Sequence, residues 1–265
     1  MTASGPYQEL RGRGIGLTGG GGHLGSSMAL ALARAGATVI VCGRQREPLE
    51  TVAAKAKDGG YSGTIIPVSA DVSTDAGVTQ TLDAIERAAG RVSGWVNNAA
   101  VARPGALLEL QRDDVTASLA NTLGDTIMAT SLAARRMTEH GGVIVNVASM
   151  YGVVSPDPGT YENHPAFHNP PTYGAAKAGV IQFTRYAAVH LAPHGIRVNA
   201  ISPGAFPGPV AQAEPDFVEE LKRRSPSGRI GAPHELDGAI TFLLSDASSY
   251  VTGHNLIVDG GWTAW

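Results

Sequence analysis

The stretch Gly14-Ile15-Gly16-Leu17-Thr18-Gly19-Gly20-Gly21-Gly22-His23-Leu24-Gly25 decides the fold of this 265-residue chain. Its first five residues predict a short strand, and a helical pattern begins at Leu24 and runs to Ala35. The glycines between them let the backbone turn tightly, and the helix N-terminus offers free N–H groups and the positive end of its dipole. This combination is typical of a phosphate-binding loop. Since Ser26, Ser27 and Met28 follow instead of a lysine, the loop favours a dinucleotide over a nucleoside triphosphate.

Strands and helices alternate along the rest of the chain. Short β-rich runs occur at Thr38–Cys42, Thr64–Val68, Gly94–Asn97, Val143–Ala148, Arg197–Ile201 and Asn255–Val258. Helical patterns separate them, among others at Pro48–Lys57, Ala76–Ala89 and Asp113–Arg136. This order predicts an α/β fold: a single doubly wound Rossmann-type domain over residues 1–265, with a central parallel sheet and helices on both faces. Ligands of such sheets bind beyond the carboxyl ends of the strands. Residues 1–12 are expected to be a flexible N-terminal segment.

Composition narrows the classes of function. The net charge is −3, so no basic surface for nucleic acid is expected, and 43% hydrophobic residues suffice for a full core. The N-terminus lacks the apolar core of a signal peptide, and no apolar stretch is long enough for a membrane span. Cys42 is the only cysteine, which excludes an intrachain disulfide and favours a cytoplasmic location. We expect its thiol to be buried.

Tyr173 and Lys177 lie one helical turn apart in Tyr173-Gly174-Ala175-Ala176-Lys177, on the same face of a predicted helix. Tyrosine normally ionises near pH ~10, and a neighbouring cation favours the phenolate. The pair can therefore take a proton from an alcohol close to neutral pH. Such pairs are common on helix surfaces, so the rest of the chain decides what this one means.

Together, TGGGGHLG and YGAAK make the chain resemble the short-chain dehydrogenase/reductase family in its compact subtype. Further matches follow in the family's order. They are Asn97-Asn98-Ala99-Ala100, which resembles its NNAG segment, Asn121 in the next helix, Ser149 after the VIVNV strand, Pro203-Gly204 and Val258-Asp259-Gly260-Gly261. The resemblance extends from about Ile15 to Gly261.

The resemblance implies an NAD(P)-dependent enzyme that acts on CH–OH groups with four catalytic residues. Tyr173 would exchange a proton with the substrate oxygen while a hydride passes between the adjacent carbon and the nicotinamide. Lys177 would lower the pKa of the tyrosine and bind the nicotinamide ribose. Ser149 would polarise the substrate oxygen, and Asn121 would hold a water that links Lys177 to solvent. The complete set argues against a non-catalytic dinucleotide sensor.

The end of the second strand bears on the choice of cofactor. A carboxylate there would bind the ribose 2′-hydroxyl of NAD, but this strand ends Cys42-Gly43-Arg44. Arg44 can pair with a 2′-phosphate, with Arg46 as a helper, so NADP(H) is favoured and NAD(H) is the alternative. The expected cofactor-binding residues are Thr18, Gly19, Gly22, His23, Leu24, Gly25, Arg44, Asp71 beside the adenine, Val72, Asn98, Ala99, Tyr173, Lys177, Pro203 and Gly204.

Two positions depart from the family's pattern. His23 takes the middle glycine position of TGxxxGxG, and the loop also reads as TGxxGxxG through Gly19, Gly22 and Gly25. The second spacing is commoner in the extended branch, which includes sugar-nucleotide epimerases. That branch carries a substantial C-terminal substrate domain, whereas this chain ends soon after its VDGG strand. Ala100 replaces the last glycine of NNAG, which is tolerated unless the backbone there needs a positive φ.

Substrate identity depends on less specific features. The segment Ser155–Pro171 is rich in proline and polar residues, and we expect it to be irregular and to border the pocket. Its polarity resembles members of the family that act on sugars, polyols or sugar acids, and Arg103 could meet a carboxylate. His164 and His168 have no companion cysteine or carboxylate cluster, so no metal is expected. Residues 205–229 are predicted to form a mobile lid.

The predicted function is therefore hydride transfer between NADP(H) and a secondary alcohol or ketone of a polar small molecule. A 3-oxoacyl thioester reductase is an alternative in the same class, and an epimerase or dehydratase with tightly bound NAD is an alternative in another. Helix Tyr173–Leu191 carries more apolar surface than one sheet face can cover. A partner subunit could cover the rest, and the resemblance implies a homodimer or homotetramer formed through that helix and the one before it.

Overall fold

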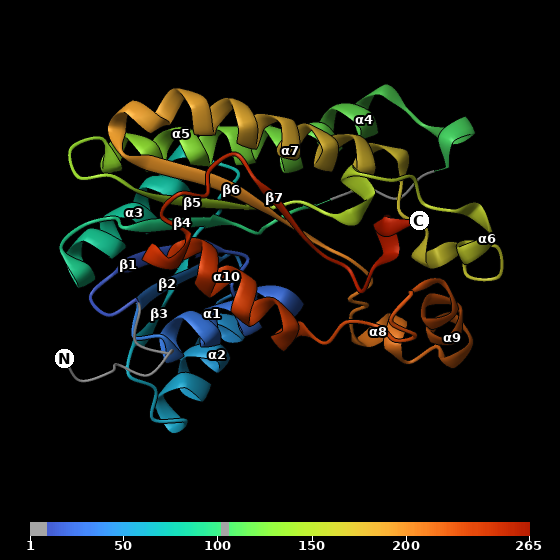
Figure 1. Cartoon of the computed structure of the whole chain (residues 1–265), viewed down its shortest axis with the longest axis horizontal. Coiled ribbons are helices and arrows are strands. Elements are labelled where there is room, and N and C mark those ends of the chain that lie inside the picture. Colours follow the sequence, from blue (N-terminus) through green and yellow to red (C-terminus); the bar gives the residue numbers. More distant parts are fainter. Residues whose placement is uncertain (1–9, 102–105) are drawn as a thin grey trace.

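The computed structural model of the chain describes residues 10–101 and 106–265. Within these residues, seven strands form one parallel sheet in the order β3-β2-β1-β4-β5-β6-β7 (Figure 1). The strands are β1 (Gly14–Thr18), β2 (Thr38–Gly43), β3 (Thr64–Ser69), β4 (Gly94–Asn97), β5 (Gly142–Val147), β6 (Ile196–Pro203) and β7 (Asn255–Val258). The order reverses between β1 and β4, so the connections that follow these strands diverge and leave a crevice between them. The fold class predicted from the sequence is confirmed.

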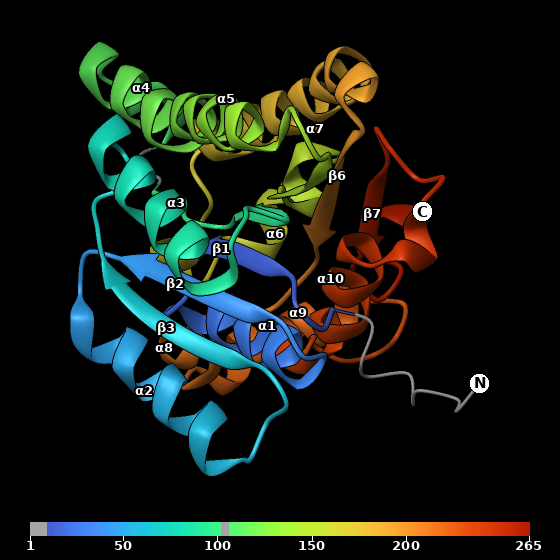
Figure 2. The ribbon, with the colours of Figure 1, turned by 90° about the vertical axis from the view of Figure 1, so that its left-hand side faces the viewer.

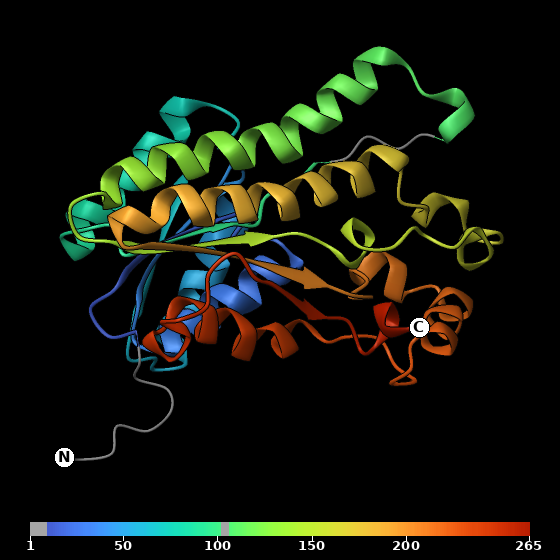
Figure 3. The same cartoon turned by 45° about the horizontal axis from the view of Figure 1, so that its top comes forward.

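Helices cover both faces of the sheet (Figure 2). One face carries α1 (His23–Arg34), α2 (Arg46–Asp58) and α10 (Asp237–Leu244). The other carries α3 (Asp75–Ala89), α4 (Arg112–Leu119), α5 (Asp125–Met137) and α7 (Pro171–Leu191), with α4 and α5 running beside α7 (Figure 3). Short 3₁₀ turns are η1 (Leu107–Glu109), η3 (Met150–Gly152), η4 (Pro165–Phe167), η5 (Ala192–His194), η6 (Pro233–Leu236), η7 (Asp246–Ser248) and η8 (Trp262–Ala264), and η2 (Ala120–Gly124) is a π-helical turn.

The hydrophobic core has one layer on each side of the sheet. Successive side chains of a strand point to opposite faces, so in β2 Val41 packs on the α1 side and Ile40 on the α5 side. Val145 and Ile144 of β5 divide in the same way, and all four residues are 0% exposed. Because both faces are covered, the strands are mostly apolar, which explains the short continuous apolar runs in the sequence.

A buried polar network ties the sheet to the helices of the second face. The Asn97 amide donates to Asn146 Oδ1 at 2.8 Å and to Thr130 Oγ1 at 2.9 Å, which joins β4 to β5 and to α5. The Asn146 amide donates in turn to Thr184 Oγ1 on α7 at 2.9 Å. Buried hydrogen bonds of this kind allow little movement because each lost partner is costly in a low-dielectric core. The network therefore fixes α5 and α7 relative to the sheet.

Three further helices lie beyond the carboxyl ends of the strands: α6 (Pro158–Tyr161), α8 (Pro209–Gln212) and α9 (Pro215–Arg224) (Figure 1). The segment Ser155–Pro171, expected to be irregular, therefore contains one short helix and the turn η4. Asp157 explains the helix, because its carboxylate accepts a hydrogen bond from Gly159 N at 2.8 Å and Pro158 suits the first helical position.

The segment 1–12, expected to be flexible, is described only from Leu10 onward. Leu10 is 0% exposed in the core, and its N–H donates to Ala35 O at 3.1 Å. Arg11 and Gly12 are exposed, and the flexibility of the segment stays a prediction. Cys42 is buried, as expected. Across residues 10–101 and 106–265, none of the helices has the length and apolarity that a membrane crossing requires.

Candidate active site

The turn after β1 is joined to the end of β4 by side-chain hydrogen bonds. Thr18 Oγ1 accepts from the backbone N–H groups of Asn98 and Ala99, both at 2.9 Å. The Asn98 amide donates back to Thr18 O at 2.9 Å and to Gly19 O at 3.2 Å. Thr18 is thus buried beneath the loop, and its hydroxyl holds the two strand ends at the crevice in a fixed relation.

The glycine loop has no room for a side chain at Gly25, and its backbone at Gly19 favours glycine. Gly19 has φ +65°, which favours glycine, and Gly22 N donates to Gly19 O at 3.0 Å. A Cβ on Gly25 would lie 2.2 Å from Gly19 O, so α1 packs directly on the loop. His23 and Ala100 are both compatible with this backbone, because no described non-glycine residue has a positive φ. The loop therefore forms its turn with the spacing Gly19, Gly22 and Gly25.

Two adjoining cavities of about 690 and 270 Å³ follow the loop and share Gly22, Asn98 and Ala100. The larger extends over Arg44, Asp71, Val72, Asn121 and Asp125. The smaller extends over His23, Leu24, Gly25, Tyr173, Lys177, Pro203 and Gly204. Every expected cofactor residue except Thr18 lines one of them. A glycine cradle at a helix N-terminus, flanked by two cavities, fits a dinucleotide whose halves lie on either side of its diphosphate.

Asn121 lies in the π-helical turn η2, which interrupts what the sequence predicted as one helix over Asp113–Arg136. A π turn adds a residue to one helical turn and frees local backbone groups, and such turns occur frequently at functional sites. Here the turn falls where Asn121 borders the larger cavity. The apolar periodicity of the sequence continues through this region, so it gave no signal of the turn.

Ser149 and Tyr173 meet where β5 ends and α7 begins. Their hydroxyls are hydrogen-bonded, and Ser149 Oγ also accepts from Tyr151 N at 3.1 Å, which orients the serine. Burial raises the pKa of the Tyr173 phenol, the hydrogen bond from Ser149 opposes that rise, and the charge of Tyr161 adds to it. That Lys177 lowers this pKa stays a prediction.

Lys177 is 4% exposed, and its Nζ donates to Val147 O at 2.6 Å. Its ammonium lies 5.7 Å from the centre of the Tyr173 ring. Burial lowers the pKa of Lys177 to about 8. An ammonium has three donors, so two remain for a ligand in the smaller cavity.

The lysine pKa predicts a pH-dependent stability for the protein freed of nucleotide. Between a folded pKa of about 8 and the ordinary 10.5, the unfolded chain binds more protons than the folded one. The free energy of unfolding therefore rises with pH from about 8 to 10.5, and below the folded pKa the buried charge of Lys177 destabilises the fold fully. Over this range we expect the free energy of unfolding of wild type to rise by about 3 kcal/mol relative to that of Lys177→Met, measured by urea unfolding at several pH values. A difference that is constant with pH would contradict this assignment.

Arg44 and Asp71 lie where β2 and β3 end, on the wall of the larger cavity. Arg44 is exposed, whereas its expected helper Arg46 is paired with Glu50 at 2.6 Å within α2 and does not line the cavity. The hydroxyl and backbone N–H of Ser73 lower the pKa of Asp71, and the charge of Arg44 contributes in the same direction. Arg44 is therefore the arginine available to a ligand in this cavity.

An aromatic cluster lies next to Tyr173, beyond the sheet. Its buried members are Met150, Tyr151, Tyr161, Phe217, Leu221 and Trp262. Phe217 of α9 stacks on Phe167 with ring centres 4.7 Å apart. His168 contacts Tyr161 edge-on, and His164 lies tilted against Phe217. These histidines are thus packed against rings, and no group of potential metal ligands occurs in the described residues.

The predicted lid and the predicted pocket segment are packed together. Phe217 and Leu221 of α9 are each 4% exposed, and the Arg224 guanidinium forms an ion pair with Asp157 and a second, 2.7 Å long, with Glu220. The segment 205–229 is therefore joined to the segment Ser155–Pro171, and its role as a mobile lid stays a prediction. Arg103 lies outside the described residues.

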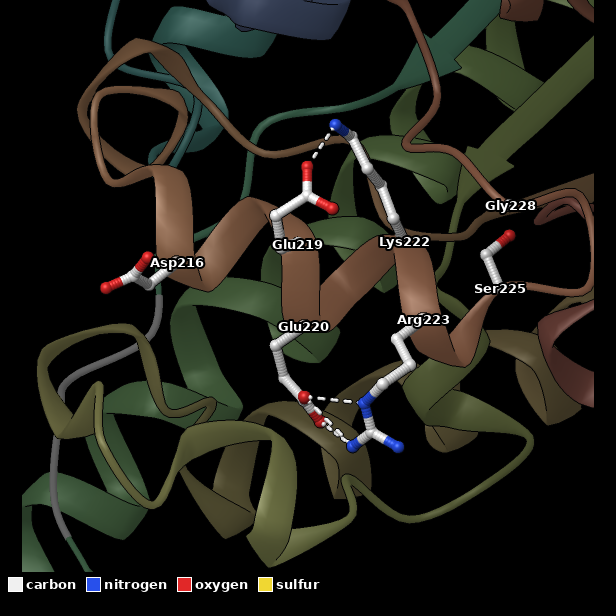
Figure 4. A pocket seen from close by; sticks show the side chains of 7 residues that line it. All are labelled: Asp216, Glu219, Glu220, Lys222, Arg223, Ser225 and Gly228. Carbon is white, nitrogen blue, oxygen red and sulfur yellow. Dashed lines mark hydrogen bonds and ion pairs between the residues drawn. The ribbon is translucent and has the colours of Figure 1, made fainter.

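A separate hollow of about 640 Å³ lies along α9, lined by Asp216, Glu219, Glu220, Lys222, Arg223, Ser225 and Gly228 (Figure 4). Lys222 pairs with Glu219 at 2.5 Å, and Arg223 pairs with Glu220 at 2.7 Å. Charges that pair three positions apart on one helix are typical of a solvated face. None of the residues expected from the sequence to bind a ligand lines this hollow.

Known proteins match the chain over almost its whole length. A family model described as enoyl-(acyl carrier protein) reductase matches residues 22–263. The chain is 33% identical to 3-oxoacyl-[acyl-carrier-protein] reductase of Thermotoga maritima, covering 96% of this chain and 98% of the relative. It is 34% identical to D-threitol dehydrogenase of Mycolicibacterium smegmatis, covering 93% and 91%.

The crystal structure of a short-chain type dehydrogenase/reductase from Mycobacterium marinum superposes with a TM-score of 0.87 at 31% identity, with 98% of each chain covered. The glycine cradle after β1 and the Tyr173–Lys177 pair on α7 lie in one crevice of that shared fold. The chain therefore belongs to the short-chain dehydrogenase/reductase family, whose NAD(P)-dependent enzymes act on CH–OH groups.

Proposed function

We propose that the chain interconverts a secondary alcohol and a ketone with NADP(H), on a sugar, polyol or sugar acid. The observation that carries the proposal is the hydrogen bond between the Ser149 and Tyr173 hydroxyls beside the Lys177 ammonium. Two hydroxyls that can share one substrate oxygen suit proton transfer at that oxygen. The D-threitol dehydrogenase relative supports a polyhydroxylated substrate.

In the proposed oxidation, Tyr173 accepts the proton of the substrate hydroxyl, and Ser149 donates a hydrogen bond to the same oxygen. A nicotinamide bound in the smaller cavity would supply the acceptor for the hydride of the adjacent carbon. Lys177, held by Val147 O, has two remaining donors that would bind the ribose hydroxyls. Asn121, at the π turn, holds a water through which the proton reaches solvent. In the reverse direction Tyr173 gives its proton to the ketone oxygen.

The choice of NADP(H) rests on Arg44. A guanidinium paired with a 2′-phosphate contributes a charge-assisted hydrogen bond that NADH cannot make. We expect Arg44→Ala to weaken NADPH binding about 10–100-fold and to leave NADH binding unchanged, measured by cofactor fluorescence titration. Arg46→Ala is the matched control, since that side chain already pairs with Glu50, and it should change neither affinity. Equal weakening of both cofactors by Arg44→Ala would remove the basis for NADP(H).

Two other functions use the same residues. The Thermotoga relative favours a 3-oxoacyl thioester reductase, because its name gives that activity. An epimerase or dehydratase would recycle a tightly held NAD, and the Gly19, Gly22 and Gly25 spacing of the loop is its support. Arg44 at the end of β2 favours an NADP(H)-linked enzyme over an epimerase that recycles NAD. It does not distinguish the thioester reductase from the polyol enzyme, since both would use NADP(H).

One preparation of protein separates the three functions. Its absorbance and released nucleotide show whether NAD is retained through purification, which would favour the epimerase. If none is retained, titration with NADPH and NADH is followed by turnover assays on polyols, sugars, sugar acids and a 3-oxoacyl thioester. Turnover of the thioester alone would reject the polyol assignment.

We propose that the chain assembles as a homodimer or homotetramer through α5 and α7. Met128 of α5 is 46% exposed, and Tyr186 and Val189 of α7 are 59% and 70% exposed. Apolar side chains this exposed along two adjacent helices are typical of a covered face. The homo-oligomeric members of the family support the same helices as the interface.

A further inference from the structure

Two phenols beside Tyr173 have no part in the proposed reaction. Tyr151 lies in η3, two residues after Ser149, and Tyr161 lies in α6. Their hydroxyls are hydrogen-bonded to each other, and the residues are only 6% and 5% exposed. Tyr161 raises the pKa of Tyr173 by its charge, and Tyr173 acts on the pKa of Tyr151 in the same direction. The pair is therefore close to the phenol that exchanges the proton.

The hydrogen bonds of this pair leave one of the two phenol O–H groups without an acceptor. Two phenols carry two hydroxyl hydrogens, and the bond between them uses one. The Asn169 amide donates to the Tyr161 hydroxyl at 3.4 Å, so it supplies no acceptor. Neither phenol makes another hydrogen bond within residues 10–101 and 106–265. One O–H is thus buried without an acceptor, and such groups are rare unless a ligand or water completes them.

The hydroxyls of Thr160 and Thr172, in the same segments, are also buried without a hydrogen-bond partner. Thr160, next to Tyr161, is 1% exposed, and Thr172, next to Tyr173, is 5% exposed. Neither Oγ1 atom has a hydrogen-bond partner in the described part of the chain. A buried hydroxyl without a partner costs stability, so a protein that keeps several around one reactive phenol has a polar ligand to gain from them.

Aromatic rings pack around the phenol pair. Phe217 lies 5.8 Å from the ring centre of Tyr161, and Trp262 belongs to the same cluster. A ligand that reaches the pair would place its C–H faces against rings and its oxygens against hydroxyls. An alcohol with a single oxygen would leave the phenol pair unsatisfied, and sites of that kind reject the analogue that lacks the polar group.

Resting on the proposed function, we infer that the Tyr151–Tyr161 pair donates a hydrogen bond to a second substrate oxygen, on the carbon next to the one oxidised. The pair is a specificity determinant for vicinal diols and α-hydroxy ketones. Removing either hydroxyl removes the free donor or its orientation, because each phenol holds the other in place. The oxidation step itself still belongs to Ser149 and Tyr173.

The test compares 2,3-butanediol with 2-butanol, and 1,2-cyclohexanediol with cyclohexanol, using NADP⁺ and full-length protein. Wild type should show a kcat/KM about 10-fold or more higher for each diol. Tyr161→Phe and Tyr151→Phe should each lower kcat/KM for the diols about 10-fold and leave the mono-alcohols within about threefold. The NADPH dissociation constant should not change. Tyr250→Phe, at a fully exposed tyrosine, is the matched control and should behave as wild type.

Three outcomes would overturn the inference, and they are distinguishable. Equal loss on diols and mono-alcohols assigns the pair a structural role. Wild type without preference for diols excludes the second contact even if both variants fail to fold, and leaves the proposed function intact. A protein that binds NADPH but oxidises none of the four alcohols, nor any polyol, removes the proposed function and the inference with it.

Discussion

Tyr173→Phe is expected to lower kcat by about 10²–10⁴-fold while the affinity for NADPH stays that of wild type. The substitution keeps the ring, which packs against the aromatic cluster, and removes only the hydroxyl that is hydrogen-bonded to Ser149. Without it, no positioned group remains that can exchange a proton with the substrate oxygen. The measurements are steady-state turnover with NADP⁺ and a fluorescence titration with NADPH.

Tyr186→Phe provides the matched control on the same helix. Tyr186 is 59% exposed, stacks its ring on His190, and lies away from both cavities. Its turnover should equal that of wild type. Activity of Tyr173→Phe within about threefold of wild type would reject the proton-transfer role of Tyr173, since a general acid–base group contributes far more. A fall in NADPH affinity would instead show that the loss arises from cofactor binding.

Gly25→Val should abolish cofactor binding and destabilise the fold. Even the Cβ of a new side chain would lie 2.2 Å from Gly19 O and 2.8 Å from the Asn98 amide nitrogen. Helix α1 would have to move off the loop, so the backbone N–H groups would no longer converge on the diphosphate. We expect NADPH affinity to fall about 100-fold or more and stability to fall by about 1–3 kcal/mol, measured by titration and by urea unfolding.

Gly238→Ala is the control for Gly25→Val, because it replaces a helical glycine where a new Cβ contacts nothing. Gly238 lies in the first turn of α10 with no atom within 4 Å of a new Cβ. Since alanine favours the helix by about 1 kcal/mol, this variant should be as stable as wild type or more so, with unchanged NADPH affinity. Wild-type NADPH binding by Gly25→Val would show that the loop does not need the close approach of α1.

The features that the sequence predicted correctly are local ones. The strand Gly14–Thr18 and the glycine turn after it follow from residues within one short segment, and the structure has the strand at the same positions. Tyr173 and Lys177 share a helix face because their spacing alone requires it. The site residues after β4, β5 and β6 converge because parallel strands present their carboxyl ends at one edge.

The features that the sequence could not predict depend on contacts between distant segments. The Tyr151–Tyr161 bond and the stacking of Phe217 on Phe167 join parts of the chain that only the folded sheet brings together. The lowered pKa of Lys177 follows from burial, which a motif does not report. The pairing of Arg46 with Glu50, four residues apart on a helix, was accessible from the sequence.

The aromatic cluster also bears on the order in which the molecule folds. Its members are as distant in the chain as Met150 and Trp262, and they pack outside the sheet rather than between its strands. Closing such long loops costs entropy that few local contacts repay, so we expect β5 and β6 to pair before the cluster forms. The cluster beside Tyr173 should then form late and open first, as a cooperative unit of its own. A ligand bound against the cluster would stabilise this part of the molecule most.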